Sequence, residues 1–192
     1  DGYKFEMQNY NFIPISEIEK NQGRTVRIAG FVTDAAHMTT KKGSKFGKMI
    51  LNNYSGNQEI VFWENNYVNY NNFIDNGQKL MIEGVYQEHR FRPGVMEFQI
   101  HRILLLDQVR KTLTKRIHLL LPLHKIDKEL VKFLHDNQKQ YVGNTELILQ
   151  VVDETDRMSI KLKSQSIRLE INDELTQFLE ERDDIKYSLE VA

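Results

Sequence analysis

Lysine is concentrated in one short stretch of this chain. Residues 37–48 hold four lysines, two glycines and one phenylalanine, and no acid interrupts them. Ammonium groups can bind the phosphates of a nucleic acid, and a flat ring beside them can stack on a base. The candidate contacts are Lys41, Lys42, Lys45, Phe46 and Lys48. A lysine-rich segment is often only a solvated loop, so this interpretation depends on the element that carries it.

A second segment combines cations with an aromatic ring. Arg90, Phe91 and Arg92 stand directly before a Pro-Gly pair, which is typical of a turn between strands. A groove that follows a nucleic-acid backbone needs both kinds of side chain. We therefore add these three residues to the candidate DNA contacts.

The elements around the two segments follow the order of one known fold. Alternating apolar and polar residues predict five strands and, after the third, a helix over residues 64–74. The strands are expected at residues 24–34, 48–54, 59–63, 79–88 and 95–106. This is the order of the oligonucleotide/oligosaccharide-binding (OB) fold, in which the loops after strands one and four flank the ligand face. The sequence thus predicts a closed five-stranded OB-fold barrel over residues 24–107, with 37–48 and 89–94 as those loops.

Four residues of this barrel have specific expected roles. Gly30 and Gly84 interrupt their strands where a barrel strand must bend. Phe62 is expected in the core. Trp63 covers the start of the helix or, alternatively, stacks on a base.

The remaining segments differ in composition from the barrel. Residues 1–23 are expected to be an approach segment that packs on the barrel, and residues 108–115 a polar connector. In residues 116–192 a strand–helix unit occurs twice, because Ile126–Leu134 and Ile171–Leu179 match at five of nine positions. Asp127 and Asn172 are expected to cap the two helices. This predicts a small α+β domain with one mixed sheet and two helices on one face.

Several function classes lack support in the sequence. The chain has no cysteine and a formal net charge of −1, so any binding to nucleic acid depends on local charge. Its apolar runs are far shorter than the ~20 residues that cross a bilayer. We find no phosphate-binding glycine loop before a helix, no metal-ligand spacing among the histidines and no catalytic constellation. We therefore expect a monomeric, non-enzymatic piece of a longer protein, without cofactor, metal or membrane.

Four stretches resemble a known family. Residues 26–33, 39–44, 59–63 and 78–84 are similar to the OB domain of the α subunit of bacterial DNA polymerase III, and the resemblance continues through the C-terminal domain. It implies a cytoplasmic, replicative DNA-directed DNA polymerase, a nucleotidyltransferase, whose active site lies upstream of these residues. It also implies that the OB domain binds single-stranded template DNA and that residues 116–192 dock the clamp-loader τ subunit.

Two other interpretations remain open from the residues alone. Both domains could bind only proteins of the replisome, in which case the lysines are merely solvated. The OB domain could also be of the anticodon-binding type found in aminoacyl-tRNA synthetases, in which case it prefers a structured RNA loop.

Overall fold

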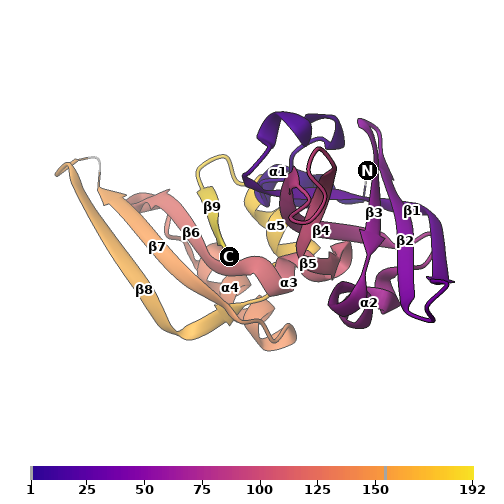
Figure 1. The fold of residues 1–192 in the computed structure, drawn as a ribbon. Helices are drawn as coiled ribbons and strands as arrows, with labels where there is room; N and C mark the ends of the chain where they lie inside the picture. The colour runs from indigo at the N-terminus through magenta and orange to yellow at the C-terminus, as the bar shows by residue number, and fades with distance from the viewer. Residues whose placement is uncertain (1, 154) are drawn as a thin grey trace. The chain divides into compact units, whose positions relative to one another are not determined.

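The computed structural model describes residues 2–153 and 155–192. They form two compact units, the first ending at Gln108 and the second beginning at Val109. Each unit is built on a β-sheet of its own (Figure 1). Within the described ranges, no helix is both long and apolar enough to pass through a membrane.

Unit 1 contains a five-stranded antiparallel sheet. Its strands are β1 (Thr25–Thr39), β2 (Lys45–Asn53), β3 (Gly56–Phe62), β4 (Lys79–Glu88) and β5 (Met96–Leu105). They lie in the order β3-β2-β1-β4-β5. The helix α2 (Glu64–Tyr70) and the 3-10 turn η3 (Asn71–Phe73) join β3 to β4, as the OB order requires.

The closed barrel that we expected is not completed by backbone pairing. Among the described residues, no ladder joins β3 to β5, so the sheet keeps two edges. Its inner face still encloses one apolar core. Ile28, Leu51, Phe62 and Leu80 are all fully buried within it, which confirms the predicted place of Phe62.

Both predicted bends coincide with close backbone contacts. A side chain on Gly30 would place its Cβ 2.5 Å from the carbonyl oxygen of Asn52, and the β1–β2 register shifts between Val32 and Asp34. At Gly84 a Cβ would collide with the carbonyl of Gln99, and the β4–β5 register shifts at that residue. Glycine is required there because no Cβ fits between the paired backbones.

The lysine-rich stretch is a hairpin and not a long loop. β1 continues to Thr39 and β2 begins at Lys45, so His37 pairs with Gly47 and Thr39 with Lys45. Only residues 40–44 form the connection. The predicted long loop is wrong, because pairing along a long two-stranded ribbon tolerates polar and glycine residues that are also typical of loops.

The approach segment contains one short helix and two 3-10 turns. α1 (Lys4–Asn9) is followed by the 3-10 turns η1 (Ile15–Glu17) and η2 (Glu19–Asn21). Phe12 forms a parallel bridge with Arg27 of β1. Ile15 and Ile18 are buried in the core of unit 1, so the segment contributes to that core.

Unit 2 is a mixed four-stranded sheet with two main helices. Its strands are β6 (Thr114–Pro122), β7 (Thr145–Asp153), β8 (Met158–Leu169) and β9 (Lys186–Val191), in the order β8-β7-β6-β9. β6 and β7 are parallel and the other pairs antiparallel. β8 contains a bulge over residues 164–167, since Lys163 pairs with Ile148 and Arg168 with Glu146.

Local sequence signals begin both helices of unit 2. Asp127 caps α4 (Lys128–Gln140) and Asn172 caps α5 (Asp173–Glu180). Each cap accepts a hydrogen bond of 2.8 Å, from the backbone N–H of Leu130 and Leu175 respectively, as predicted. The expected polar connector differs, because the turn η4 (Leu106–Gln108) and α3 (Val109–Leu113) occupy it, and Val109 and Leu113 are fully buried.

Candidate nucleic-acid interface

The β1–β2 connection is a tight, internally bonded turn. The N–H of Thr40 donates to the carbonyl of Ser44 at 2.8 Å, and the N–H of Ser44 donates to Oγ1 of Thr40 at 3.1 Å. Gly43 closes the turn with a φ of +86°, a left-handed conformation that favours glycine. The turn therefore presents Lys41 and Lys42 at its apex and Lys45 at the start of β2.

An aromatic stack stands beside this turn. The rings of Phe46 and Trp63 lie 4.4 Å apart between centroids at an interplanar angle of 15°. Trp63 keeps 40% of its surface exposed, while Phe46 is half-buried. Glu64, which follows Trp63 and begins α2, has a φ of +45°, an uncommon conformation for a residue with a side chain. The stack leaves an exposed indole available to a further flat ring.

His37 of the hairpin is hydrogen-bonded to helix α2 and to the segment that follows it. The two ring nitrogens of His37 lie 3.0 Å from Oη of Tyr67 and 3.1 Å from the carbonyl oxygen of Ile74. Gly47 allows this approach, because a Cβ there would collide with Ile74 and lie 3.2 Å from the Tyr67 ring. The hairpin and α2 are thereby held as the two walls of one hollow.

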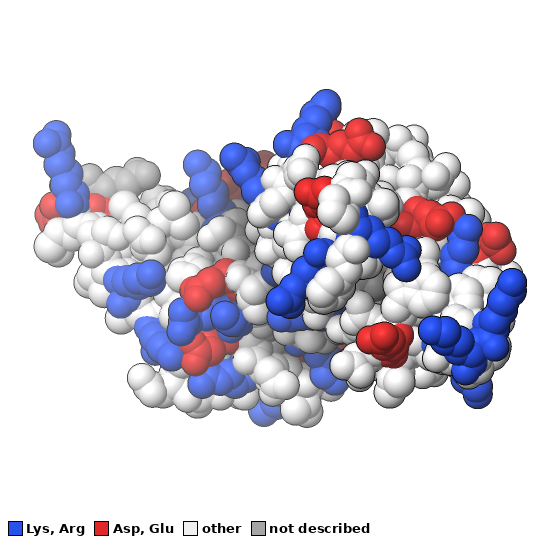
Figure 2. All heavy atoms as spheres, in the orientation of Figure 1, with Lys and Arg blue, Asp and Glu red and all other residues white. Residues whose placement is uncertain are grey.

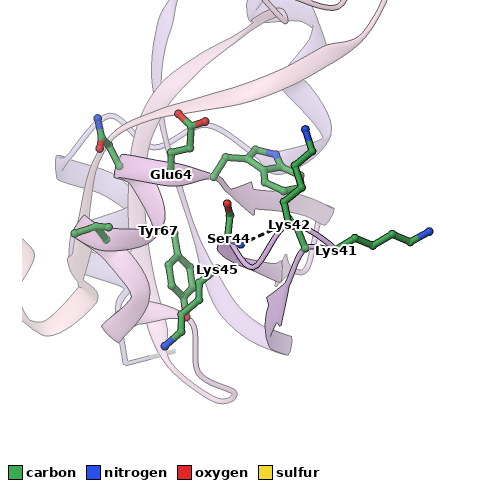
Figure 3. Close-up of a pocket in the computed structure, with 10 residues that line it drawn as sticks. Lys41, Lys42, Ser44, Lys45, Glu64 and Tyr67 are labelled. Atoms are coloured by element: carbon green, nitrogen blue, oxygen red, sulfur yellow. Dashed lines mark hydrogen bonds between the residues drawn. The ribbon is translucent and has the colours of Figure 1, made fainter.

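We call this hollow the tip pocket; its volume is about 740 Å³. It is lined by residues 40–42, 44 and 45 of the hairpin and by residues 63–65, 67 and 68 of the α2 segment. In Figure 3 the chains of Lys41, Lys42 and Lys45 extend from the turn in three different directions. Of the described lining residues, only Glu64 is acidic. Figure 2 shows blue side chains gathered at this end of the hairpin. The pocket thus combines excess positive charge with an exposed ring.

The structure separates Lys48 from the other three lysines. Its Nζ lies 2.5 Å from Oε2 of Glu59 on the neighbouring strand β3. In the part of the chain that is described, Lys41, Lys42 and Lys45 make no ion pair of this kind. A phosphate would have to compete with Glu59 for Lys48, whereas the other three ammonium groups are available.

The second basic segment lies away from the tip pocket. Thr25 pairs with Val85 near the end of β4, whereas Thr39 pairs with Lys45 at the start of β2. The 89–94 connection therefore follows one end of β1 and the tip pocket the other. Cζ of Arg90 lies 5.4 Å from the centroid of the Phe91 ring, and that ring is 80% exposed. Arg90, Phe91 and Arg92 do not line the tip pocket, so the single groove that we expected from both segments is not formed.

The α2 side of the pocket was the part that sequence reasoning missed. Tyr67 and Val68 line the tip pocket, whereas the pattern of this segment predicts only a helix over residues 64–74. The available signal was Trp63, a half-polar ring at a strand–helix junction, for which base stacking had been one alternative. Its pairing with Phe46 depends on the β2–β3 register, because Gly47 pairs with Phe62.

Two family models match adjacent parts of the chain. Residues 26–106 match a model described as an OB-fold nucleic acid binding domain, and residues 117–190 match the C-terminal domain of the DNA polymerase III alpha subunit. The first match and the strand order confirm the predicted fold class.

DNA polymerase III subunit alpha of Vibrio cholerae is 23% identical over 137 residues, which cover 70% of this chain and 12% of that protein. The Escherichia coli K12 protein is 22% identical over 124 residues, covering 65% and 11%. The matched region is thus a small share of the relatives' length.

Solved structures resemble about half of this chain. Asparaginyl-tRNA synthetase from Pyrococcus horikoshii has a TM-score of 0.35 and 18% identity, covering 49% of this chain and 22% of its own. The second OB-fold domain of replication protein A from Methanococcus maripaludis has a TM-score of 0.33 and 15% identity, covering 48% and 92%. The mitochondrial single-stranded DNA binding protein Rim1 of Saccharomyces cerevisiae has a TM-score of 0.33 and 14% identity, covering 43% and 95%. At these TM-scores the likenesses carry no argument about function.

Proposed function

Because this chain belongs to the C-terminal region of the bacterial DNA polymerase III α family, we propose that its OB domain binds single-stranded DNA at the tip pocket. The observation that carries the proposal is that Lys41, Lys42 and Lys45 line one pocket with Trp63, whose ring stacks on Phe46. In this proposal the ammonium groups bind phosphates and the exposed face of Trp63 receives a base.

Lys48 and the second basic segment differ from the three lysines of the tip pocket. Lys48 is a weaker contact in it, because Glu59 already neutralises its charge. Arg90, Phe91 and Arg92 stay a prediction, and as contacts they would bind a different stretch of the strand. The parent chain is proposed to be a DNA-directed DNA polymerase of the bacterial cytoplasm, with its catalytic groups in another part of the protein.

We also propose that unit 2 docks the clamp-loader τ subunit. The support is the match of residues 117–190 to the family's C-terminal domain, together with the resemblance seen in the sequence. Co-elution of the 192-residue chain with purified τ tests this directly. If τ and the chain elute separately at micromolar concentrations, the docking proposal is wrong.

The DNA proposal is tested by titrating the chain with oligo-dT while the emission of Trp63 is recorded. Trp63 is the single tryptophan of the sequence, so its emission reports on the tip pocket alone. Binding with a change in this emission is the expected result. Binding without such a change would mean that the DNA binds another surface of the chain. A stable RNA hairpin that bound more tightly than oligo-dT would favour the anticodon-type interpretation, and no binding of either would favour a purely protein-binding region.

A further inference from the structure

The two helices of unit 2 enclose an acidic hollow with aromatic walls, which we call the helix groove. It has a volume of about 320 Å³. Its side chains come from one face of α4 and from the neighbouring part of α5. The residues that matter below are Glu129, Phe133, Asp136, Asn137, Glu174 and Phe178.

The aromatic part of the groove is a parallel ring stack. Phe133 and Phe178 lie 3.8 Å apart between centroids at an interplanar angle of 4°. They occupy equivalent positions of the two repeated strand–helix units, so the duplication brings both rings to one seam. Cζ of Arg182 already lies 5.9 Å from the centroid of Phe178. Phe133 has its partner ring on one face, which leaves the other face for a planar cation.

A buried carbonyl lacks its hydrogen-bond donor at the same seam. Asn137 is 2% exposed and lines the groove. Its Nδ2 donates to Oδ1 of Asn172 at 3.4 Å, and that oxygen also accepts from the N–H of Leu175 at 2.8 Å. The second bond identifies the Asn172 atom as oxygen and so fixes the orientation of Asn137. Among the described residues, Oδ1 of Asn137 has no partner, and a buried acceptor of this kind is stabilised by an incoming donor.

The charge of the groove determines which sign of charge its ligand carries. Three carboxylates line it against one cation, Lys132. Glu174 is hydrogen-bonded to Tyr141, which raises the pKa of that phenol, and Glu129 lies 3.7 Å from Arg182. The remaining negative charge disfavours a phosphate and favours a cation. Nucleic acid is therefore a poor ligand for this groove.

We propose that the helix groove binds an arginine side chain of a protein partner. A guanidinium group is planar and always charged, stacks on aromatic rings and carries several N–H donors in one plane. One face of Phe133 would take the plane, Oδ1 of Asn137 would accept one N–H, and Asp136 or Glu174 would accept another. Lysine offers a single ammonium centre and cannot satisfy the ring, the amide and a carboxylate in this way. The inference deepens the proposed docking function of unit 2, since it assigns a surface and a chemistry to it.

The test uses the whole 192-residue chain and two small probes of equal charge. N-acetyl-arginine amide and N-acetyl-lysine amide are titrated separately while NMR follows the side-chain amide of Asn137 and the ring signals of Phe133 and Phe178. We expect these signals to shift with the arginine probe. The chain should bind the lysine probe about two- to fivefold more weakly, which is the range of an exposed cation–π contact. Equal responses to both probes, or no shift of these signals, would overturn the proposal.

Variants separate recognition from simple charge attraction. Phe133→Leu keeps an apolar side chain and is expected to abolish the preference for arginine, whereas Lys139→Gln, on exposed surface of the same helix, is expected to keep it. Unchanged shifts elsewhere in unit 2 show that a variant is folded. A Phe133→Leu chain that still prefers arginine would refute the role of the ring. Binding to τ is measured in parallel: a chain that responds to arginine but not to τ refutes only τ docking, and the reverse refutes only the groove.

Discussion

Replacing three lysines at the tip pocket should change how DNA binding depends on salt. Each phosphate contact on a single strand contributes about 0.7 to the slope of log affinity against log salt. Lys41, Lys42 and Lys45 have no acidic partner in the described structure, so their joint change to alanine should flatten the slope by up to about 2. Between about 50 and about 200 mM salt, the native chain should then lose about twentyfold more affinity than the variant.

Fluorescence anisotropy of labelled oligo-dT at several salt concentrations measures this slope. The matched control replaces Lys128, Lys139 and Lys161, three exposed lysines of unit 2, and removes the same formal charge. Its slope should stay close to that of the native chain. Equal flattening by both triple variants would mean that net charge alone attracts DNA, and an unchanged slope in the tip variant would remove the tip pocket from the interface.

Further predictions follow from particular side chains. Trp63→Ala should weaken oligo-dT binding by about 1–3 kcal/mol if a base stacks there, and unchanged affinity in the same titration would exclude stacking. The double change of Arg90 and Arg92 to alanine should leave the change in Trp63 emission intact. If residues 90–92 contact DNA, the double change should also flatten the salt slope, and an unchanged slope would exclude these residues from the interface. Hydrogen bonds from Lys163 and Arg116 lower the pKa of Glu146 to about 2 from its ordinary value of 4.5. The Glu146 carboxylate therefore stabilises unit 2 when the pH is above the pKa that Glu146 has in the unfolded chain. This stabilisation is lost as the pH falls from about 4.5 towards 2. Thermal melts near pH 7 and pH 3 should show a smaller drop for Glu146→Gln than for the native chain, and an equal drop would contradict this. Gly84→Ala should destabilise unit 1 by about 1–3 kcal/mol in urea unfolding, because its Cβ meets the backbone of Gln99; a native midpoint would refute the close approach.

Affinity at the tip pocket should also respond to its one described acid. Glu64 lines the hollow beside the lysines, so its carboxylate repels phosphate. Glu64→Gln should therefore raise the affinity for oligo-dT, most clearly at low salt where charges are least screened. Lower affinity in the same anisotropy assay would show that the carboxylate has a positioning role instead.

Local chemistry accounts for what the sequence by itself determined. Asp127 and Asn172 indicate where the two helices begin, because the side chain of a cap accepts a hydrogen bond from the N–H three residues later. Gly30 and Gly84 mark the bends, because no other residue fits where a paired backbone approaches so closely. The strand order, and with it the OB fold, followed from such short-range signals. Each of these signals is carried by a single residue or a short run of residues, so it can be read from the linear chain.

Tertiary structure decided how distant residues combine into a site. The β2–β3 register stacks Phe46 on Trp63 and pairs Lys48 with Glu59, so one of four similar lysines is neutralised and one ring becomes a platform. Because β1 and β2 pair as far as Thr39 and Lys45, the expected long loop is a hairpin, and the two basic segments lie at opposite ends of β1. Side chains of equal type acquired different roles because charge and stacking depend on distances of a few ångströms, which only the folded chain sets.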